Sequence, residues 1–153
     1  MSFYLQYVFL PFLPFAVGAW PLVLRLLSRK SGFPDLAEVY GRAPSGAFGN
    51  PSARLAEVHV GAVHYASGLH LSTAAGGLAM VGWGPFRPWH SPVFIPIDEL
   101  EVEPLEAVRV EDWDQPFAEG DYVRLTPHQR PDVPIHMKAS LARHLQLVEQ
   151  SRP

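Results

Sequence analysis

The chain has 153 residues, a net charge of −3 and an isoelectric point of about 6.1, which suit one acidic domain. It has no surplus of lysine and arginine to neutralise phosphates, so nucleic-acid binding is disfavoured. Cysteine is absent, which excludes disulfides and thiolate metal sites. Sixteen prolines and twelve glycines disfavour a helical bundle and are typical of short strands joined by sharp turns.

The N-terminal segment is apolar and long. Residues 3–24 contain no charged side chain, and Gln6 is their only strongly polar residue. As a helix this segment would be about 33 Å long, which matches a hydrocarbon core of about 30 Å. Tyr4 and Trp20 lie toward its ends, as interfacial aromatics do. We therefore predict a transmembrane anchor within residues 1–30; a buried core helix and a helix lying in the interface are the alternatives.

The charges that flank the anchor predict its orientation. No lysine or arginine precedes it, whereas Arg25, Arg29 and Lys30 follow it. The positive-inside rule then places the N-terminus outside and the rest of the chain in the cytoplasm. A cleaved signal peptide would need a basic region before the apolar run, and that region is missing. The lipid bilayer is thus the first predicted partner.

Residues 31–54 are predicted to form a juxtamembrane helix and a loop, with the helix over residues 34–40. Residues 55–153 are predicted to form a β-rich domain, either a small β barrel or a two-sheet sandwich. Residues 55–60 and 62–66 are separate strands or one strand with a bulge at Gly61. Further strands are expected at residues 69–71 and 76–81 with a turn at 73–77, and at residues 93–97, 100–110, 121–126 and 133–137. A C-terminal amphipathic helix is expected over residues 139–148.

Three segments within this domain, Gly68–Leu71, Gly77–Met80 and His90–Leu100, carry a resemblance to a known family. Together with the order of elements, they resemble the strand–strand–Ile-Pro run of bacterial pleckstrin-homology and GRAM-like domains, which also occur in uncharacterised single-pass proteins. The resemblance covers about residues 68–100 and implies a binding or scaffolding module rather than an enzyme. Lipid-binding members carry basic loop residues for phosphoinositide head groups, and the loops of this chain are not basic.

The most unusual segment is Val81–Pro92, which holds two tryptophans, one phenylalanine, three prolines and one cation. Three interpretations remain open: the loop folds back on its own core, it inserts at the membrane surface, or it contacts a protein partner. The candidate binding residues are Trp83, Phe86, Arg87, Trp89 and His90.

The remaining polar residues predict no catalytic, metal or cofactor site. The seven histidines lack the spacing of a zinc site, although His64 and His70 would meet if they lay on adjacent strands. No serine lies in a Gly-x-Ser-x-Gly elbow. Ten of the fifteen acids lie between Asp98 and Asp121. They are interpreted as a solvated face, a docking face for a basic partner, or a calcium site.

The predicted function is therefore non-enzymatic. The chain is expected to be an accessory or scaffolding subunit of a larger membrane protein complex. Its anchor would pack against other transmembrane helices through Ala16, Gly18 and Ala19. The alternative is a pleckstrin-homology-like module that binds a lipid or another amphiphile at the membrane surface.

Overall fold

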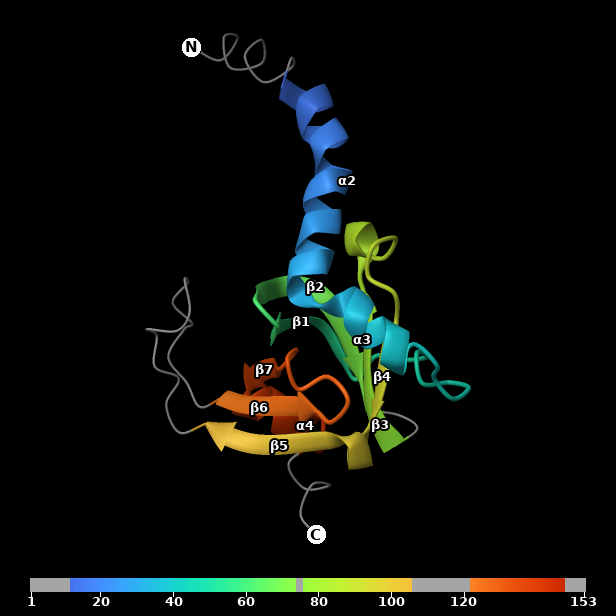
Figure 1. Cartoon of the computed structure of the whole chain (residues 1–153), viewed down its shortest axis with the longest axis vertical. Helices are drawn as coiled ribbons and strands as arrows, with labels where there is room; N and C mark the ends of the chain where they lie inside the picture. The colour runs from blue at the N-terminus through green and yellow to red at the C-terminus, as the bar shows by residue number, and fades with distance from the viewer. Residues whose placement is uncertain (1–11, 74–75, 106–121, 148–153) are drawn as a thin grey trace.

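One antiparallel sheet of seven strands organises the chain in a computed structural model that describes residues 12–73, 76–105 and 122–147 (Figure 1). The strands follow the order β4-β3-β2-β1-β7-β6-β5, so β1 lies at the centre and the sheet curls into a nearly closed barrel. A mainly β fold with a C-terminal helix is thus confirmed. The strands are β1 (Ala53–Val60), β2 (Val63–Ser72), β3 (Gly77–Gly82), β4 (Val93–Pro96), β5 (Leu100–Leu105), β6 (Tyr122–Pro127) and β7 (Ile135–Lys138).

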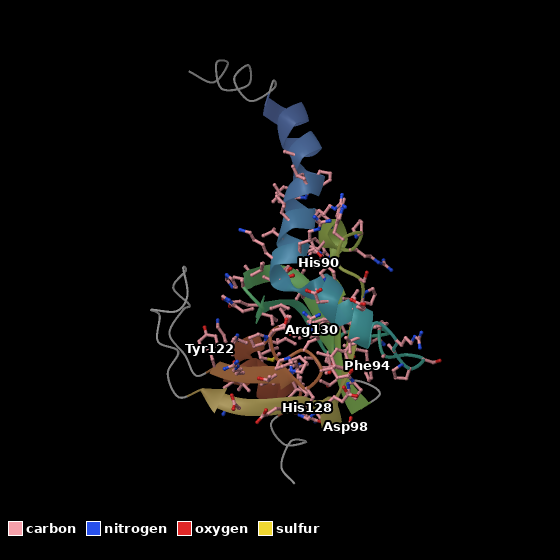
Figure 2. The ribbon with its side chains drawn as sticks, in the orientation of Figure 1. His90, Phe94, Asp98, Tyr122, His128 and Arg130 are labelled. Carbon is pink, nitrogen blue, oxygen red and sulfur yellow. The ribbon has the colours of Figure 1, made fainter. Side chains whose placement is uncertain are left out.

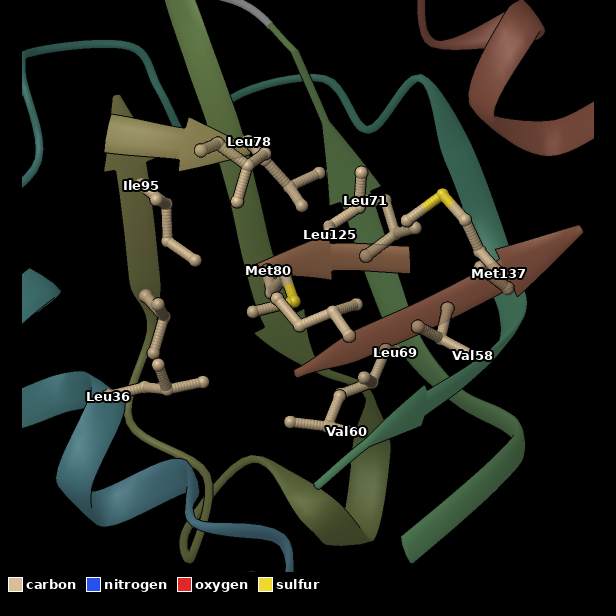
Figure 3. Packing of buried hydrophobic residues seen from close by; sticks show 14 of the residues in the cluster. Leu36, Val58, Val60, Leu69, Leu71, Leu78, Met80, Ile95, Leu125 and Met137 are labelled. Carbon is tan, nitrogen blue, oxygen red and sulfur yellow. The ribbon is translucent and has the colours of Figure 1, made fainter. Parts of the chain in front are cut away.

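The core lies inside the curl of this sheet. Because successive side chains of a strand point to opposite faces, alternate residues such as Val58 and Val60 of β1 reach the interior. Leu69 of β2, Met80 of β3 and Met137 of β7 meet them there and are fully buried (Figure 3). The outward positions of β1 and β7 carry polar and charged residues such as Glu57, His136 and Lys138.

The connection between β1 and β2 differs from one of the two predicted alternatives. Gly61 is not a bulge within a continuous strand but the first residue of a two-residue hairpin turn, in which Val60 pairs with Val63. A positive φ of 54° at Gly61 suits such a turn. The irregular pairing lies instead within β1, where Leu55 has a φ of 51°. The two strands predicted at residues 62–66 and 69–71 are one strand, β2.

Helix α3 (Phe33–Tyr40) confirms the helix predicted over residues 34–40. Pro34 lies in its first turn, and Phe33, Leu36 and Tyr40 are buried. The Tyr40 hydroxyl donates a hydrogen bond to a Glu99 carboxylate oxygen at 3.0 Å and accepts one from the Gln129 backbone N–H at 3.2 Å. These bonds fix the end of α3 to the loop after β6 and to the short 3₁₀ helix η3 (Ile97–Glu99).

Helix α2 (Phe12–Ser31) precedes α3, and only Gly32 separates the two. The N-terminal half of α2 projects away from the strands (Figure 1). It includes residues 12–24 of the predicted anchor, and residues 3–11 lie outside the described part of the chain. Within the described part, none of the helices combines the length and the apolar character that crossing a bilayer requires.

The C-terminal helix is shorter than predicted. Helix α4 covers Ala139–His144 rather than residues 139–148. Gln146 has a φ of 58°, a left-handed conformation that cannot continue an α-helix. Leu145 and Leu147 are nevertheless fully buried and belong to the hydrophobic core. The last predicted position, Val148, lies outside the described residues.

We predict that Gly61→Ala lowers the free energy of unfolding by about 2–4 kcal/mol. A left-handed alanine costs about 1–2 kcal/mol, and a Cβ at this site would lie 2.6 Å from the Ser31 carbonyl oxygen. Urea denaturation of the full-length protein measures the loss. Gly46→Ala is the matched control, because Gly46 has a φ of 85° but a Cβ added there would have no heavy atom within 4 Å. Equal losses in both variants would contradict the predicted clash.

Candidate functional site at the base of helix α2

The loop between β3 and β4 is held against the last turns of α2. The Ser28 hydroxyl donates a hydrogen bond of 2.6 Å to the Trp89 carbonyl oxygen, which joins two segments 61 residues apart. The Ser31 hydroxyl in turn donates to the Ser28 carbonyl at 2.8 Å. At the start of the loop, the Trp83 backbone N–H donates to the Gly68 carbonyl at 2.9 Å. The loop therefore has a fixed position beside the helix.

His90 is the residue through which this loop enters the core (Figure 2). Its side chain is fully buried, with Nδ1 3.0 Å from the Phe86 carbonyl oxygen and Nε2 2.7 Å from the Tyr65 hydroxyl. A carbonyl can only accept, so Nδ1 carries the proton and the Tyr65 hydroxyl donates to Nε2. The Phe33 ring packs edge-on against the imidazole at 4.9 Å. Sequence reasoning identified His90 as a candidate binding residue, and the structure places its side chain in this internal cluster.

Burial determines the protonation of this cluster. Desolvation lowers the pKa of His90, and the hydrogen bond to the Phe86 carbonyl only partly opposes this effect. Desolvation also raises the pKa of Tyr65 to about 12. Both groups are therefore neutral near pH 7, and their bond is a neutral hydrogen bond that positions the loop.

The rest of the loop faces outward. Trp83 is 47% exposed, and Arg87 is also exposed. Phe86 and Trp89 are half-buried, and the Phe86 ring contacts Tyr65 edge-on at 6.0 Å. The 3₁₀ helix η2 (Gly84–Phe86) turns the chain between these residues. Of the three interpretations of this segment, folding back on the core holds for the side of the loop that carries His90. The other side exposes Trp83 and Arg87.

Helix α2, like the loop beside it, exposes both apolar side chains and cations. Leu24, Ser28 and Ser31 recur at helical spacing and are buried, so they form the face that contacts the domain. Trp20 lies one turn before Leu24 on the same face and is 50% exposed. Among residues 18–31 of α2, the other large apolar residues that are exposed are Leu22, Val23 and Leu26, and the exposed cations are Arg25, Arg29 and Lys30.

A hollow of about 430 Å³ opens beside the α2–α3 junction. Arg29 and Lys30 line it together with Asp35 and Asp132, so its charges balance. Arg130 bridges the two acids, at 2.7 Å from Asp132 and 3.5 Å from Asp35. Both carboxylates are thus already paired with Arg130. We therefore interpret the hollow as a feature of how α2 and α3 pack at their junction.

The histidines gather elsewhere than predicted. His64 and His70 both lie on β2, so they do not have the adjacent-strand arrangement in which they could have met. Instead His64 stacks on His59 of β1 with ring centroids 4.3 Å apart, and His59 pairs in register with His136 of β7. Neighbouring ion pairs join Glu57 to Lys138 at 2.9 Å and to His64 at 3.3 Å. The pairing of β1 with β7 creates this row, and no sequence signal indicated it.

Burial is the largest effect on the histidines of this row. It lowers the pKa of His59 to about 3, with further lowering by His64 and His136. It lowers the pKa of His136 to about 4, with a contribution from the charge of Arg124. Within residues 12–73, 76–105 and 122–147, no group of three or more acids and histidines has the arrangement of a metal site.

Four acids of the predicted acidic stretch are described. Asp98, Glu101 and Glu103 are exposed, and Glu99 accepts the bonds from Tyr40 and Gln129. They lie on η3 and β5, at the end of the domain away from α2 (Figure 1). The other six, from Glu106 to Asp121, lie outside the described residues, so the docking-face interpretation stays a prediction.

We predict that Tyr65→Phe lowers the free energy of unfolding by about 1–3 kcal/mol, because it leaves the buried Nε2 of His90 without its donor. Chemical denaturation monitored by tryptophan fluorescence measures the change. Tyr40→Phe is the control, since its hydroxyl bonds at the half-buried edge of the domain, where water can replace the lost partner. A loss in Tyr65→Phe no larger than in the control would contradict this role.

We also predict that the protein loses stability between pH 7.5 and pH 5. His59, His136 and His90 have lowered pKa values in the folded state, whereas an unfolded histidine titrates near 6.5. The unfolded state therefore binds more protons below pH 6.5, and the stability present above that pH is lost as the pH falls toward 4. The loss at pH 5 is about 1–2 kcal/mol each for His59 and His136, and the lowered pKa of His90 adds to it in the same direction.

Denaturation midpoints across this pH range measure the effect. His136→Gln should show a shallower dependence than the wild-type protein, because one buried imidazole is gone. The range lies above the ordinary carboxylate pKa values, so acid titration of Glu57 and Asp132 contributes little. An unchanged slope in the variant would contradict the prediction.

Comparison of the chain with protein-family models, with curated proteins and with solved structures yields no significant match. Residue chemistry and geometry are therefore the basis for the function proposed below.

Proposed function

We propose that this protein is a membrane-anchored, non-enzymatic accessory or scaffolding subunit of a larger membrane protein complex. The observation that carries this proposal is the asymmetry of α2. One face of the helix is bonded to the β domain, whereas its outer part exposes Trp20, Leu22 and Val23, which are 50%, 60% and 41% exposed. Contiguous apolar surface of this kind is characteristic of a membrane or partner contact.

The sequence around α2 supports a bilayer as the first contact. The apolar segment of residues 3–24 begins before the first described residue, and Arg25, Arg29 and Lys30 follow it. The three cations are exposed, as groups at a headgroup layer are. In this orientation the N-terminus lies outside and the β domain lies in the cytoplasm.

Contacts with other subunits are proposed at two levels. Within the bilayer, Gly18 is exposed and has no heavy atom within 4 Å of a Cβ position, so another helix can approach it closely. In the cytoplasm, the exposed acids Asp98, Glu101 and Glu103 suit a basic partner surface.

A scaffolding role also agrees with where the perturbed groups lie. His59, His90 and His136 have lowered pKa values, but each is packed within or against the sheet rather than lining the hollow. These three histidines therefore contribute to the packing of the domain. The alternative function, a pleckstrin-homology-like lipid-binding module, is favoured by the nearly closed barrel and by the exposed pair Trp83 and Arg87.

We predict that full-length protein extracted from its native membranes in mild detergent migrates in a complex with other membrane proteins. The variant Trp20→Asp with Leu22→Asp should lose both membrane retention and the complex, since a charge in the apolar segment costs up to about 3 kcal/mol. Native gel electrophoresis and mass spectrometry of the co-migrating chains measure this outcome.

Leu55→Asp is the matched control for these substitutions. Leu55 is a 43% exposed leucine on β1, away from α2, and its left-handed backbone accommodates aspartate. This variant should behave as the wild type does. Recovery of the wild-type protein as a lone monomer that needs only lipid would contradict the accessory role and favour the lipid-binding alternative. Recovery in the supernatant after an alkaline wash would refute anchoring altogether.

A further inference from the structure

We propose that the Trp83–Trp89 loop is a second membrane contact, which lies in the headgroup layer of the same leaflet that α2 leaves and binds anionic phospholipid surface. The inference rests on the proposed anchoring of α2. It adds where the loop lies relative to the bilayer, how deep it lies and which kind of lipid it contacts. It decides between the membrane and a protein partner for the exposed side of this segment.

The depth of the loop follows from its bond to α2. The apolar segment ends at Leu24, and Ser28 is four residues further along the helix, or about 6 Å at 1.5 Å per residue. The headgroup layer on each side of a hydrocarbon core is about 5–7 Å thick. Ser28 therefore lies within that layer, and the Trp89 carbonyl is 2.6 Å from its hydroxyl. An ordinary helix tilt of about 20° changes this depth little.

The loop is also held so that it cannot withdraw from this depth. His90 anchors its end in the core through the Tyr65 hydroxyl, and Phe33 at the start of α3 packs against the same imidazole. The bond from His90 to the Phe86 carbonyl closes the loop on itself. The loop and the helix base therefore move together as one unit. When α2 is inserted, the loop is at the membrane surface without any rearrangement.

The exposed residues of the loop have the chemistry of that layer. Trp83 combines a large apolar ring with an indole N–H, which is the combination enriched at membrane interfaces. Arg87 has an aliphatic stem and a guanidinium group that reaches lipid phosphates. With Arg25, Arg29 and Lys30 it brings four exposed cations to the base of α2.

The charge distribution of the whole domain supports the same orientation. The protein has a net charge of −3, so attraction to anionic lipid cannot come from its overall charge. Asp98, Glu101 and Glu103 lie on η3 and β5, at the far end from α2 (Figure 1). An anionic surface therefore attracts the end that carries α2 and the loop, and repels the acidic end.

Single-cysteine labelling tests this inference, because the natural chain has no cysteine to remove. Three variants of the full-length protein each receive an environment-sensitive fluorophore: Pro85→Cys in the loop, Leu22→Cys in α2 and Glu101→Cys on β5. All three positions are exposed. Each labelled protein is reconstituted in vesicles of phosphatidylcholine and phosphatidylglycerol that carry a spin label either on the headgroup or deep in the acyl chain.

The loop label should be quenched more strongly by the headgroup spin label than by the deep one, and the Leu22 label should show the reverse order. The Glu101 label should be quenched by neither. Because α2 sets the depth of the loop, adding Trp83→Ser and Arg87→Gln to the Pro85→Cys protein should leave its headgroup quenching in phosphatidylcholine vesicles unchanged. The two substitutions should remove the additional headgroup quenching that phosphatidylglycerol gives, because they remove the exposed indole and guanidinium groups.

The two failures are distinguishable. An unquenched Leu22 label would overturn the anchoring of α2 and with it the proposed function. A quenched Leu22 label beside a loop label that behaves like Glu101 would overturn only the present inference, and it would assign the exposed side of the loop to a protein partner.

Discussion

The hydrogen bond from the Ser28 hydroxyl to the Trp89 carbonyl is the contact on which the arrangement of helix and domain depends. Ser28 lies near the end of α2, and Trp89 lies in the longest described loop between strands. Without this bond the loop would be held by the β domain alone, through His90 and through the backbone bond from Trp83 to Gly68. With it, a buried serine of α2 fixes the position of the loop relative to the helix.

A second set of contacts supports this junction from the opposite side. Gly32, with a φ of 74°, turns the chain between α2 and α3, and a Cβ there would collide with Val133. The β1–β2 turn is equally close, because Gly61 approaches the Ser31 carbonyl. Two glycines and two serines thus let backbone segments from distant parts of the sequence meet at short range. This close packing explains why the end of α2 is fixed, although most of the helix makes no contact with the strands.

Most strands could be predicted from the sequence because burial selects short runs that are either alternating, as in β6, or continuously apolar, as in β3 and β4. The helix over residues 34–40 was equally clear from Pro34 and the spacing of Leu36 and Tyr40. The role of Gly61 was not decided, since a bulge and a tight turn both require a positive φ. The end of α4 was missed because Leu145 and Leu147 are both buried, whereas the left-handed Gln146 between them interrupts the helix and has no signature in the apolar pattern.

The candidate site was predicted in part. The sequence identified the aromatic and proline-rich loop, but it could not separate His90, which points inward, from Trp83 and Arg87, which point outward. That separation depends on the Tyr65 hydroxyl, which lies 25 residues earlier and becomes a neighbour only when β2 pairs with β3. The row of His59, His64 and His136 depends likewise on strand pairing, in this case between residues more than seventy positions apart.

The single residue between α2 and α3 has a mechanical consequence. Because no flexible linker separates the helix from the domain, a rotation of α2 is transmitted to the sheet as a rotation of the same angle. The tilt of a helix in a bilayer responds to the thickness of the hydrocarbon layer. A domain joined in this rigid way rotates together with its helix. For a given change in tilt, the β5 edge undergoes the largest displacement, because it lies at the end of the domain farthest from α2.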